Sequence, residues 1–122
     1  MNRTILLLCS FVFFTSCGGD PGNQADREFE VLADRFIGRY LQLHPEAATA
    51  LGTHRYDHRL DDYSATGIAS SSAMLRAYRD TLRSIRVEEL SPGHMIDYDI
   101  FQQVLDARLF ELEELREWEW NP

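Results

Sequence analysis

The stretch DREFEVLADRFIGRYLQL, residues 26–43, decides the fold class of this chain. Its apolar side chains recur at spacings of three and four residues, which is the period of one face of an α-helix. They are Phe29, Leu32, Ala33, Phe36, Ile37, Tyr40 and Leu41. The stretch therefore predicts an amphipathic helix. We expect it to end at His44, because a residue that precedes a proline is disfavoured in the helical region.

Three further helices follow from similar signals. PEAATALG, residues 45–52, predicts a short helix with Pro45 at its first position and Gly52 as a left-handed stop. Residues 53–64 are expected to form a polar loop. We expect the side chains of Tyr56 and Leu60 to hold this loop against the rest of the protein. Residues 65–85 and 92–118 predict two long helices, the second with Ser91 as its N-cap.

The resulting fold class is all-α, with three long amphipathic helices and one short helix. Their apolar spacing of three and four residues continues through residue 115, and no segment alternates with the period of two that a half-buried strand requires. We expect these helices to form the amino-terminal part of a larger helical protein.

The first residues predict a targeting segment. Arg3 precedes an apolar run over residues 5–14, which is too short to span a bilayer comfortably and is typical of a cleaved signal. FTSC, residues 14–17, resembles a bacterial lipobox, although Phe14 replaces the usual leucine. We expect residues 1–16 to be a lipoprotein signal peptide, Cys17 to be lipidated, and residues 17–26 to be a flexible tether. The alternative is an ordinary secretory signal with Cys17 as a spare thiol.

These expectations also predict the location of the protein. Removal of the signal takes Cys9 with it and leaves Cys17 alone, so no internal disulfide is possible. We expect a membrane-anchored protein of the cell envelope. Gly18, in place of aspartate after Cys17, favours the outer membrane in a cell that has one. Residues 27–122 would then be the helical body.

The charge of the chain excludes some classes of partner. The chain has 12 basic residues, all of them arginine, against 20 Asp and Glu, for a formal net charge of −8. Loss of Arg3 with the signal leaves −9. This excess argues against nucleic acid, which is bound mainly by neutralising phosphates. It also argues against electrostatic docking on anionic lipid, so the membrane contact is expected to be the anchor alone.

Two histidine-containing segments suggest a metal site, and neither provides a complete one. His54 and His58 lie four residues apart, a spacing that two zinc ligands share on a helix, but Gly52 has just ended one. EELSPGH, residues 88–94, matches E-x-x-P-G-H and lacks the histidine that would complete H-E-x-x-P-G-H. We expect no metal and no cofactor in this chain. It has no G-x-S-x-G elbow and no phosphate-binding glycine loop, and we assign no catalytic residue.

LREWEWNP, residues 115–122, places two large apolar rings, Trp118 and Trp120, after the last expected helix. Tryptophan rings need a surface to pack against. We expect this stretch to lead into another element of a longer protein. The alternative is that both rings fold back on the first helix.

Several of these stretches together resemble one family. HPEAATALGTHRYDHRLDD, residues 44–62, corresponds to P-x-x-A-T-x-L-G-x-H-x-Y-D-x-x-L-x-D, and the stretches ELSPGHMIDYDIFQQVL and LREWEWNP follow it. This pattern resembles the amino-terminal region of the bacterial domain of unknown function 885 family, over residues 29–122. In that family pattern Asp97 and Tyr98 belong to an L-S-x-x-D-x-x-D-Y segment, which accounts for the incomplete motif at residues 88–94.

The resemblance implies a large helical protein similar to zinc-dependent peptidases. Its H-E-x-x-P-G-H motif would lie far downstream, with two histidine ligands and a glutamate that activates a zinc-bound water. No position here can take those roles. In a full-length protein, the loop at residues 53–64 would border the cleft for a peptide substrate, with His54 or Tyr56 contacting it.

Three functional hypotheses follow. The first is the amino-terminal part of a lipid-anchored, zinc-dependent peptidase-like hydrolase, inactive alone, whose partner is the rest of its own polypeptide. The second is a self-contained small helical lipoprotein that binds a helical partner through its third long helix. The third is a small metal-binding lipoprotein that uses His54 and His58.

Overall fold

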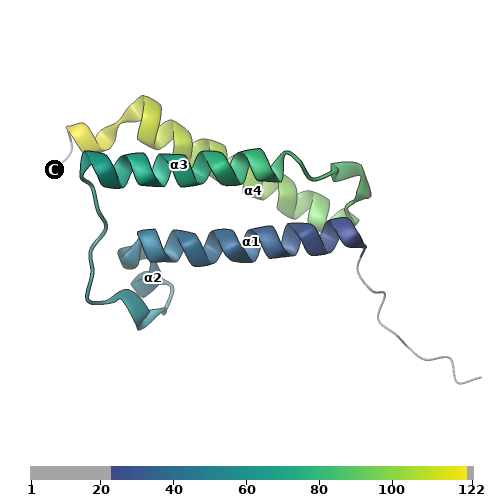
Figure 1. Cartoon of the computed structure of the whole chain (residues 1–122), viewed down its shortest axis with the longest axis horizontal. Helices are drawn as coiled ribbons and strands as arrows, with labels where there is room; N and C mark the ends of the chain where they lie inside the picture. Colours follow the sequence, from purple (N-terminus) through teal and green to yellow (C-terminus); the bar gives the residue numbers. More distant parts are fainter. Residues whose placement is uncertain (1–22, 121–122) are drawn as a thin grey trace, which may run out of the picture.

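Three long helices lie side by side in the computed structural model, which describes residues 23–120 (Figure 1). They are α1 (Gln24–Leu43), α3 (Ala65–Leu82) and α4 (Pro92–Phe110), and α1 runs antiparallel to α3. A short helix α2 (Pro45–Ala50) follows α1. No strand occurs in the described part of the chain, so the all-α prediction is confirmed there. The expected signal peptide and Cys17 lie outside the described residues.

Helix α1 begins earlier than its apolar pattern indicates. It starts at Gln24 rather than at residue 26, because the side chain of Asn23 accepts a hydrogen bond from the Asp26 backbone N–H and so caps the helix. The last residues of the expected tether are therefore helical. The helix ends at Leu43, before His44 and Pro45, as predicted.

The turn after α2 has the predicted geometry. Gly52 has a φ of +83°, the left-handed conformation that closes a helix and that other residues adopt only with strain. A single-turn 3-10 helix, η1 (His54–Tyr56), follows it. Tyr56 is half-buried in this segment, but Leu60 is 78% exposed, so the expectation that Leu60 packs the loop down is wrong.

Helix α3 begins as its sequence predicts and ends sooner. Ser64 is its N-cap, and the Ser64 hydroxyl accepts a hydrogen bond from the Gly67 N–H. The helix ends at Leu82 rather than at residue 85, and Ile85 remains buried in the turn that follows. A second 3-10 turn, η2 (Val87–Glu89), then leads to α4.

The predicted third long helix, over residues 92–118, is wrong in its last part. Helix α4 ends at Phe110 and continues as a π-helical turn, η3 (Glu111–Leu115). Arg116 then adopts a left-handed φ of +51°, which breaks the helix before the short 3-10 turn η4 (Glu117–Glu119). The indole N–H of Trp118 donates to the carbonyl oxygen of Leu112 at 3.0 Å, which satisfies a backbone group near the helix end.

The tryptophans do not follow the alternative expectation of packing on α1, and the expectation that the stretch leads into another element stays a prediction. The indole N–H of Trp120 also points back, to the carbonyl oxygen of Leu115 at 3.4 Å, and its ring is 66% exposed. The rings therefore turn back on the end of their own helix rather than folding onto α1.

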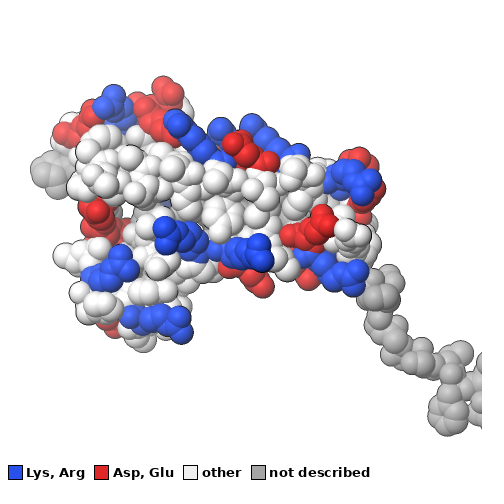
Figure 2. All heavy atoms as spheres, in the orientation of Figure 1, with Lys and Arg blue, Asp and Glu red and all other residues white. Residues whose placement is uncertain are grey.

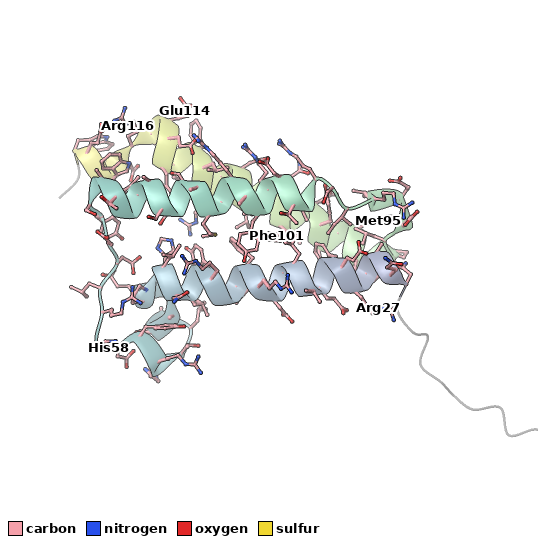
Figure 3. The ribbon with its side chains drawn as sticks, in the orientation of Figure 1. Arg27, His58, Met95, Phe101, Glu114 and Arg116 are labelled. Carbon is pink, nitrogen blue, oxygen red and sulfur yellow. The ribbon has the colours of Figure 1, made fainter. Side chains whose placement is uncertain are left out.

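The core lies between the three long helices and is rich in aromatic rings. Phe101 of α4 lies between α1 and α3 (Figure 3), with its ring 4.8 Å from that of Phe36 and 6.4 Å from that of Phe29. Leu82 and Leu105 have no exposed surface. Burying a leucine side chain of this kind contributes about 1.5–3 kcal/mol. No helix within residues 23–120 is long and apolar enough to cross a membrane.

Candidate functional site

A groove opens where the end of α1, the start of α3 and the end of α4 meet, at the left of Figure 1. Its volume is about 720 Å³. Its lining combines aromatic, apolar and acidic side chains: Tyr40, His44, Asp61, Asp62, Tyr63, Ile68, Ser71, Leu75, Arg108, Glu111, Leu112, Leu115, Glu117 and Trp118. A concave surface of this size that mixes aromatic and polar groups is the default candidate for a binding site.

One wall of the groove is held by a histidine–aspartate pair that links α1 to the loop. His44 Nδ1 lies 2.8 Å from Asp61 Oδ2, and the two side chains are largely buried. Asp61 Oδ1 also accepts a hydrogen bond from the Glu46 backbone N–H at 3.1 Å, so one carboxylate caps the start of α2 and orients the imidazole. The ring of Tyr40 stacks against that of His44 at 4.4 Å.

The next stretch of the loop is held against the first turn of α3. The Ser64 N–H donates to Asp62 Oδ1 at 3.0 Å, and hydrogen bonding with Ser64 lowers the pKa of Asp62. The Asp62 carbonyl oxygen lies so close to Gly67 that a Cβ there would meet it at 2.1 Å. Only glycine allows this approach, which places Asp61, Asp62 and Tyr63 along the groove.

The opposite wall is formed by the π turn and carries most of the remaining charge. Arg108 donates to Glu111 at 2.8 Å, and this hydrogen bond raises the pKa of Arg108. Glu117 and Trp118 complete the rim. Asp61 and Asp62 on the other wall bring the number of carboxylates in the groove to four, together with Glu111 and Glu117. The one guanidinium is that of Arg108. The groove therefore has a negative potential that favours cationic or neutral ligands.

The paired His44 and Asp61 resemble the base and orienting carboxylate of a hydrolase. Among the described residues, however, no serine, threonine or cysteine side chain forms a hydrogen bond with His44. Nucleophilic catalysis requires a nucleophile within hydrogen-bond reach of its base. The pair links the end of α1 to the loop, and no catalytic residue is assigned.

His54 and Tyr56, the predicted cleft contacts, lie in η1 and do not line this groove. His54 is 70% exposed on its side chain and pairs with Asp57, its Nδ1 lying 3.0 Å from Asp57 Oδ2. Asp57 also accepts the Thr49 hydroxyl at 2.7 Å, and that hydrogen bond lowers the pKa of Asp57. The loop reaches the groove through residues 61–63 instead, and contact of His54 or Tyr56 with a substrate stays a prediction.

The metal that the family resemblance implies does not fit the described residues. No group of three or more His, Cys, Asp or Glu side chains within residues 23–120 is placed to hold an ion. His58 is exposed in the turn after η1, away from the long helices (Figure 3). Zinc binding needs at least three protein ligands, so no chemical step is assigned to a metal here.

His94 lies in a second polar cluster, at the other end of the three helices. His94 Nδ1 lies 2.9 Å from Ser91 Oγ and 3.3 Å from Asp26 Oδ1. The other ring nitrogen, Nε2, lies 3.3 Å from Glu30 Oε1. Ser91 and Asp26 thus share one ring nitrogen, and the carboxylate on the other nitrogen belongs to Glu30, whose side chain is 60% exposed. This cluster therefore holds α1 against the start of α4, and the E-x-x-P-G-H match at residues 88–94 has a structural role.

Asp26 is the centre of that cluster and was not apparent from the sequence. It is buried and accepts the Ser91 backbone N–H at 2.9 Å, which holds the pKa of Asp26 below its ordinary value. Ser91 is the N-cap of α4 by position, as predicted, but its hydroxyl pairs with His94 rather than with the helix backbone. The Asn23 side-chain amide donates to the Glu89 carbonyl oxygen at 2.6 Å and strengthens this connection.

Comparison with known proteins identifies the family. The model for bacterial proteins of unknown function, DUF885, matches residues 45–122, which is more than half of the chain. The chain belongs to the DUF885 family. No curated protein and no solved structure matches it.

Most of the residues that line the groove lie within the DUF885 match. It begins at Pro45, so α1 lies outside it, and of the groove residues only Tyr40 and His44 precede it. The resemblance noted from the sequence extended back to residue 29, and the match supports it from residue 45 onward. The groove is therefore mainly a feature of the DUF885 part of the chain.

Proposed function

We propose that this chain is the amino-terminal helical part of a lipid-anchored, zinc-dependent peptidase-like hydrolase of the bacterial cell envelope. The observation that carries the proposal is the DUF885 match, which includes α3, α4 and most of the groove. In this proposal the groove and the outer side of α4 are covered by the catalytic part of the hydrolase. Lipidation of Cys17 holds the whole protein at the membrane.

Exposed apolar side chains on the outer side of α4 support the proposal that another part of the protein covers this side. Ile96, Ile100 and Val104 recur every four residues on it and are exposed. An exposed apolar stripe on one helix is typical of a surface that packs against another protein or another part of the same chain. The groove at the end of the same helix adds Leu112, Leu115 and Trp118.

The native product provides the first test. Intact-mass measurement of the protein isolated from cells is expected to show a lipidated polypeptide several times larger than 14.1 kDa, with bound zinc. The isolated 122-residue chain is expected to hydrolyse no peptide when zinc is added. Zinc-dependent hydrolysis by the isolated chain would contradict the proposal, as would a stable lipidated product of about the mass of this chain.

The α4 stripe also favours the second candidate, a small helical lipoprotein that binds a helical partner. Sedimentation of the isolated chain separates the two candidates. Part of a hydrolase, with its covered surface exposed, is expected to self-associate, and Ile100→Gln is expected to reduce this. Val31→Gln removes a similarly exposed apolar side chain from α1 and is the matched control. A monomer that unfolds cooperatively would instead favour the binding lipoprotein.

A further inference from the structure

Ten of the eleven arginines in residues 23–120 fall into two groups that differ in their partners. In the second half of the chain, five of the six arginines form ion pairs with carboxylates: Arg76 with Glu113, Arg79 with Asp106, Arg86 with Glu89, Arg108 with Glu111 and Arg116 with Glu119. The sixth, Arg83 at the end of α3, has no ion pair among the described residues. In the first half, within residues 24–60, five arginines form no ion pair with any described residue: Arg27, Arg35, Arg39, Arg55 and Arg59. The acidic net charge is therefore distributed unevenly.

Helix geometry places three of the unpaired arginines on one flank of α1. Arg27, Arg35 and Arg39 are separated by eight and four residues, so they follow one side of the helix over about 18 Å. Val31 lies between them and is about half exposed. Glu28 and Asp34 lie beside this flank, and the Glu28 carboxylate accepts a hydrogen bond from Gln24 at 2.8 Å.

The other two unpaired arginines lie beside exposed leucines. Arg55 and Arg59 belong to residues 51–60, which follow α2 and include η1, and in which Leu51 is 74% and Leu60 78% exposed. Figure 2 shows basic groups in a row along α1 and over this segment, on the same face of the molecule. The face thus combines guanidinium groups with leucine side chains that contact no core.

We propose that this face, consisting of the α1 arginine flank and the Leu51–Leu60 segment, docks on an anionic phospholipid bilayer. Phosphate headgroups are complementary to unpaired guanidinium groups, which bind them in a bidentate geometry. Exposed leucines beside them gain free energy by entering the boundary between headgroups and acyl chains. In this proposal the face adds a second membrane contact to the anchor, which net charge alone did not predict.

The position of the face relative to the anchor supports a bilayer over an acidic protein. Cys17 precedes the first residue of α1 by seven positions, a chain length of at most about 25 Å. An anchor so close raises the local concentration of the α1 flank at the membrane. This argument rests on the proposed function, because it assumes that Cys17 is lipidated.

The test uses the protein as cells produce it, with neutral phosphatidylcholine vesicles and with vesicles that contain 30% phosphatidylglycerol. Flotation with neutral vesicles reports the anchor and tests the proposed function. Hydrogen exchange, measured by mass spectrometry, reports the docked face. We expect phosphatidylglycerol to slow exchange in residues 24–40 and 51–60 relative to neutral vesicles, and 0.5 M salt to abolish the difference.

The variant Arg35→Gln, Arg39→Gln, Arg59→Gln removes three positive charges from the face. Each arginine near an anionic surface contributes roughly a fivefold factor, so this variant is expected to lower the docking equilibrium by roughly 100-fold. The variant Leu60→Ser is expected to weaken docking while leaving its dependence on salt unchanged.

The control variant Arg76→Gln, Arg86→Gln, Arg116→Gln removes the same charge from arginines that are already paired with carboxylates. It is expected to dock as the unaltered protein does. Equal exchange on both kinds of vesicle, or equal loss of docking in both triple variants, would overturn the inference. A protein that floats only with anionic vesicles would refute the anchor and support the docking face.

Discussion

Gly67 and Gly38 provide a test in which the structure reverses the sign that helix propensity predicts. Both glycines lie in helices, and replacing a helical glycine with alanine ordinarily stabilises a protein by about 0.5–1 kcal/mol. At Gly38, in α1, an added Cβ would meet nothing within 4 Å. Gly38→Ala is therefore expected to raise the free energy of unfolding by that amount.

At Gly67 the same substitution is expected to destabilise the protein. An added Cβ would lie 2.1 Å from the Asp62 carbonyl oxygen and 2.8 Å from its carbonyl carbon, which are backbone atoms that cannot rotate away. Relieving an overlap of this kind by a backbone shift costs about 1–3 kcal/mol. Since this exceeds the gain in propensity, we expect a net loss of about 1–2 kcal/mol.

Urea denaturation followed by circular dichroism at 222 nm, together with thermal unfolding, measures both variants. Each kcal/mol corresponds to roughly 4–8 °C in the Tm of a domain of this size. Gly38→Ala is expected to raise the Tm and Gly67→Ala to lower it. If Gly67→Ala were as stable as the unaltered protein, the contact between Asp62 and α3 that shapes the groove would be wrong.

Three further changes test separate parts of the fold. Gly52→Ala is expected to cost about 1 kcal/mol by urea denaturation, because a φ of +83° is strained for alanine although no atom obstructs its Cβ. Leu105→Ala, at a core position with no exposed surface, is expected to cost about 2–5 kcal/mol in the same assay. The third change concerns pH. Because the pKa of Asp26 is lower in the folded protein than its ordinary value of 3.8, the charged carboxylate stabilises the fold. This stabilisation is complete above pH 3.8 and is lost as the pH falls through the lower pKa of the folded state. Asp26→Asn is therefore expected to be less stable at pH 7 and to lose less stability between pH 5 and pH 2, as measured by urea midpoints.

The helices were predictable where their ends are determined by local residues. Pro45, Gly52 and Ser64 each act on the few residues beside them, so the bounds of α2 and the start of α3 follow from sequence. The end of α4 could not be predicted in this way. Leu109, Leu112 and Leu115 continue the helical period, and the interruption depends on the left-handed Arg116 and on the indole of Trp118.

The candidate site depends on contacts between residues that are far apart in sequence, and these carry no local signal. His44 and Asp61 are 17 residues apart, and Asp26 and Ser91 are 65 apart. The histidines that attracted attention by their spacing, His54 and His58, lie outside the groove. Net charge was similarly uninformative, because composition does not show which arginines lack a carboxylate partner.

The groove and the proposed membrane face are compatible with one another, because they use different sides of α1. Tyr40 lies four residues after the buried Phe36, and its ring packs against Phe36 at 5.7 Å, so the groove is reached from the core side of the helix. Arg35 precedes Phe36 and Arg39 precedes Tyr40, so at 100° per residue both arginines are turned toward another side of the helix. A bilayer that contacts the arginine flank therefore leaves the groove open to the rest of the protein. Loss of docking in the arginine variants should accordingly leave the groove, and the stability that depends on Gly67, unchanged.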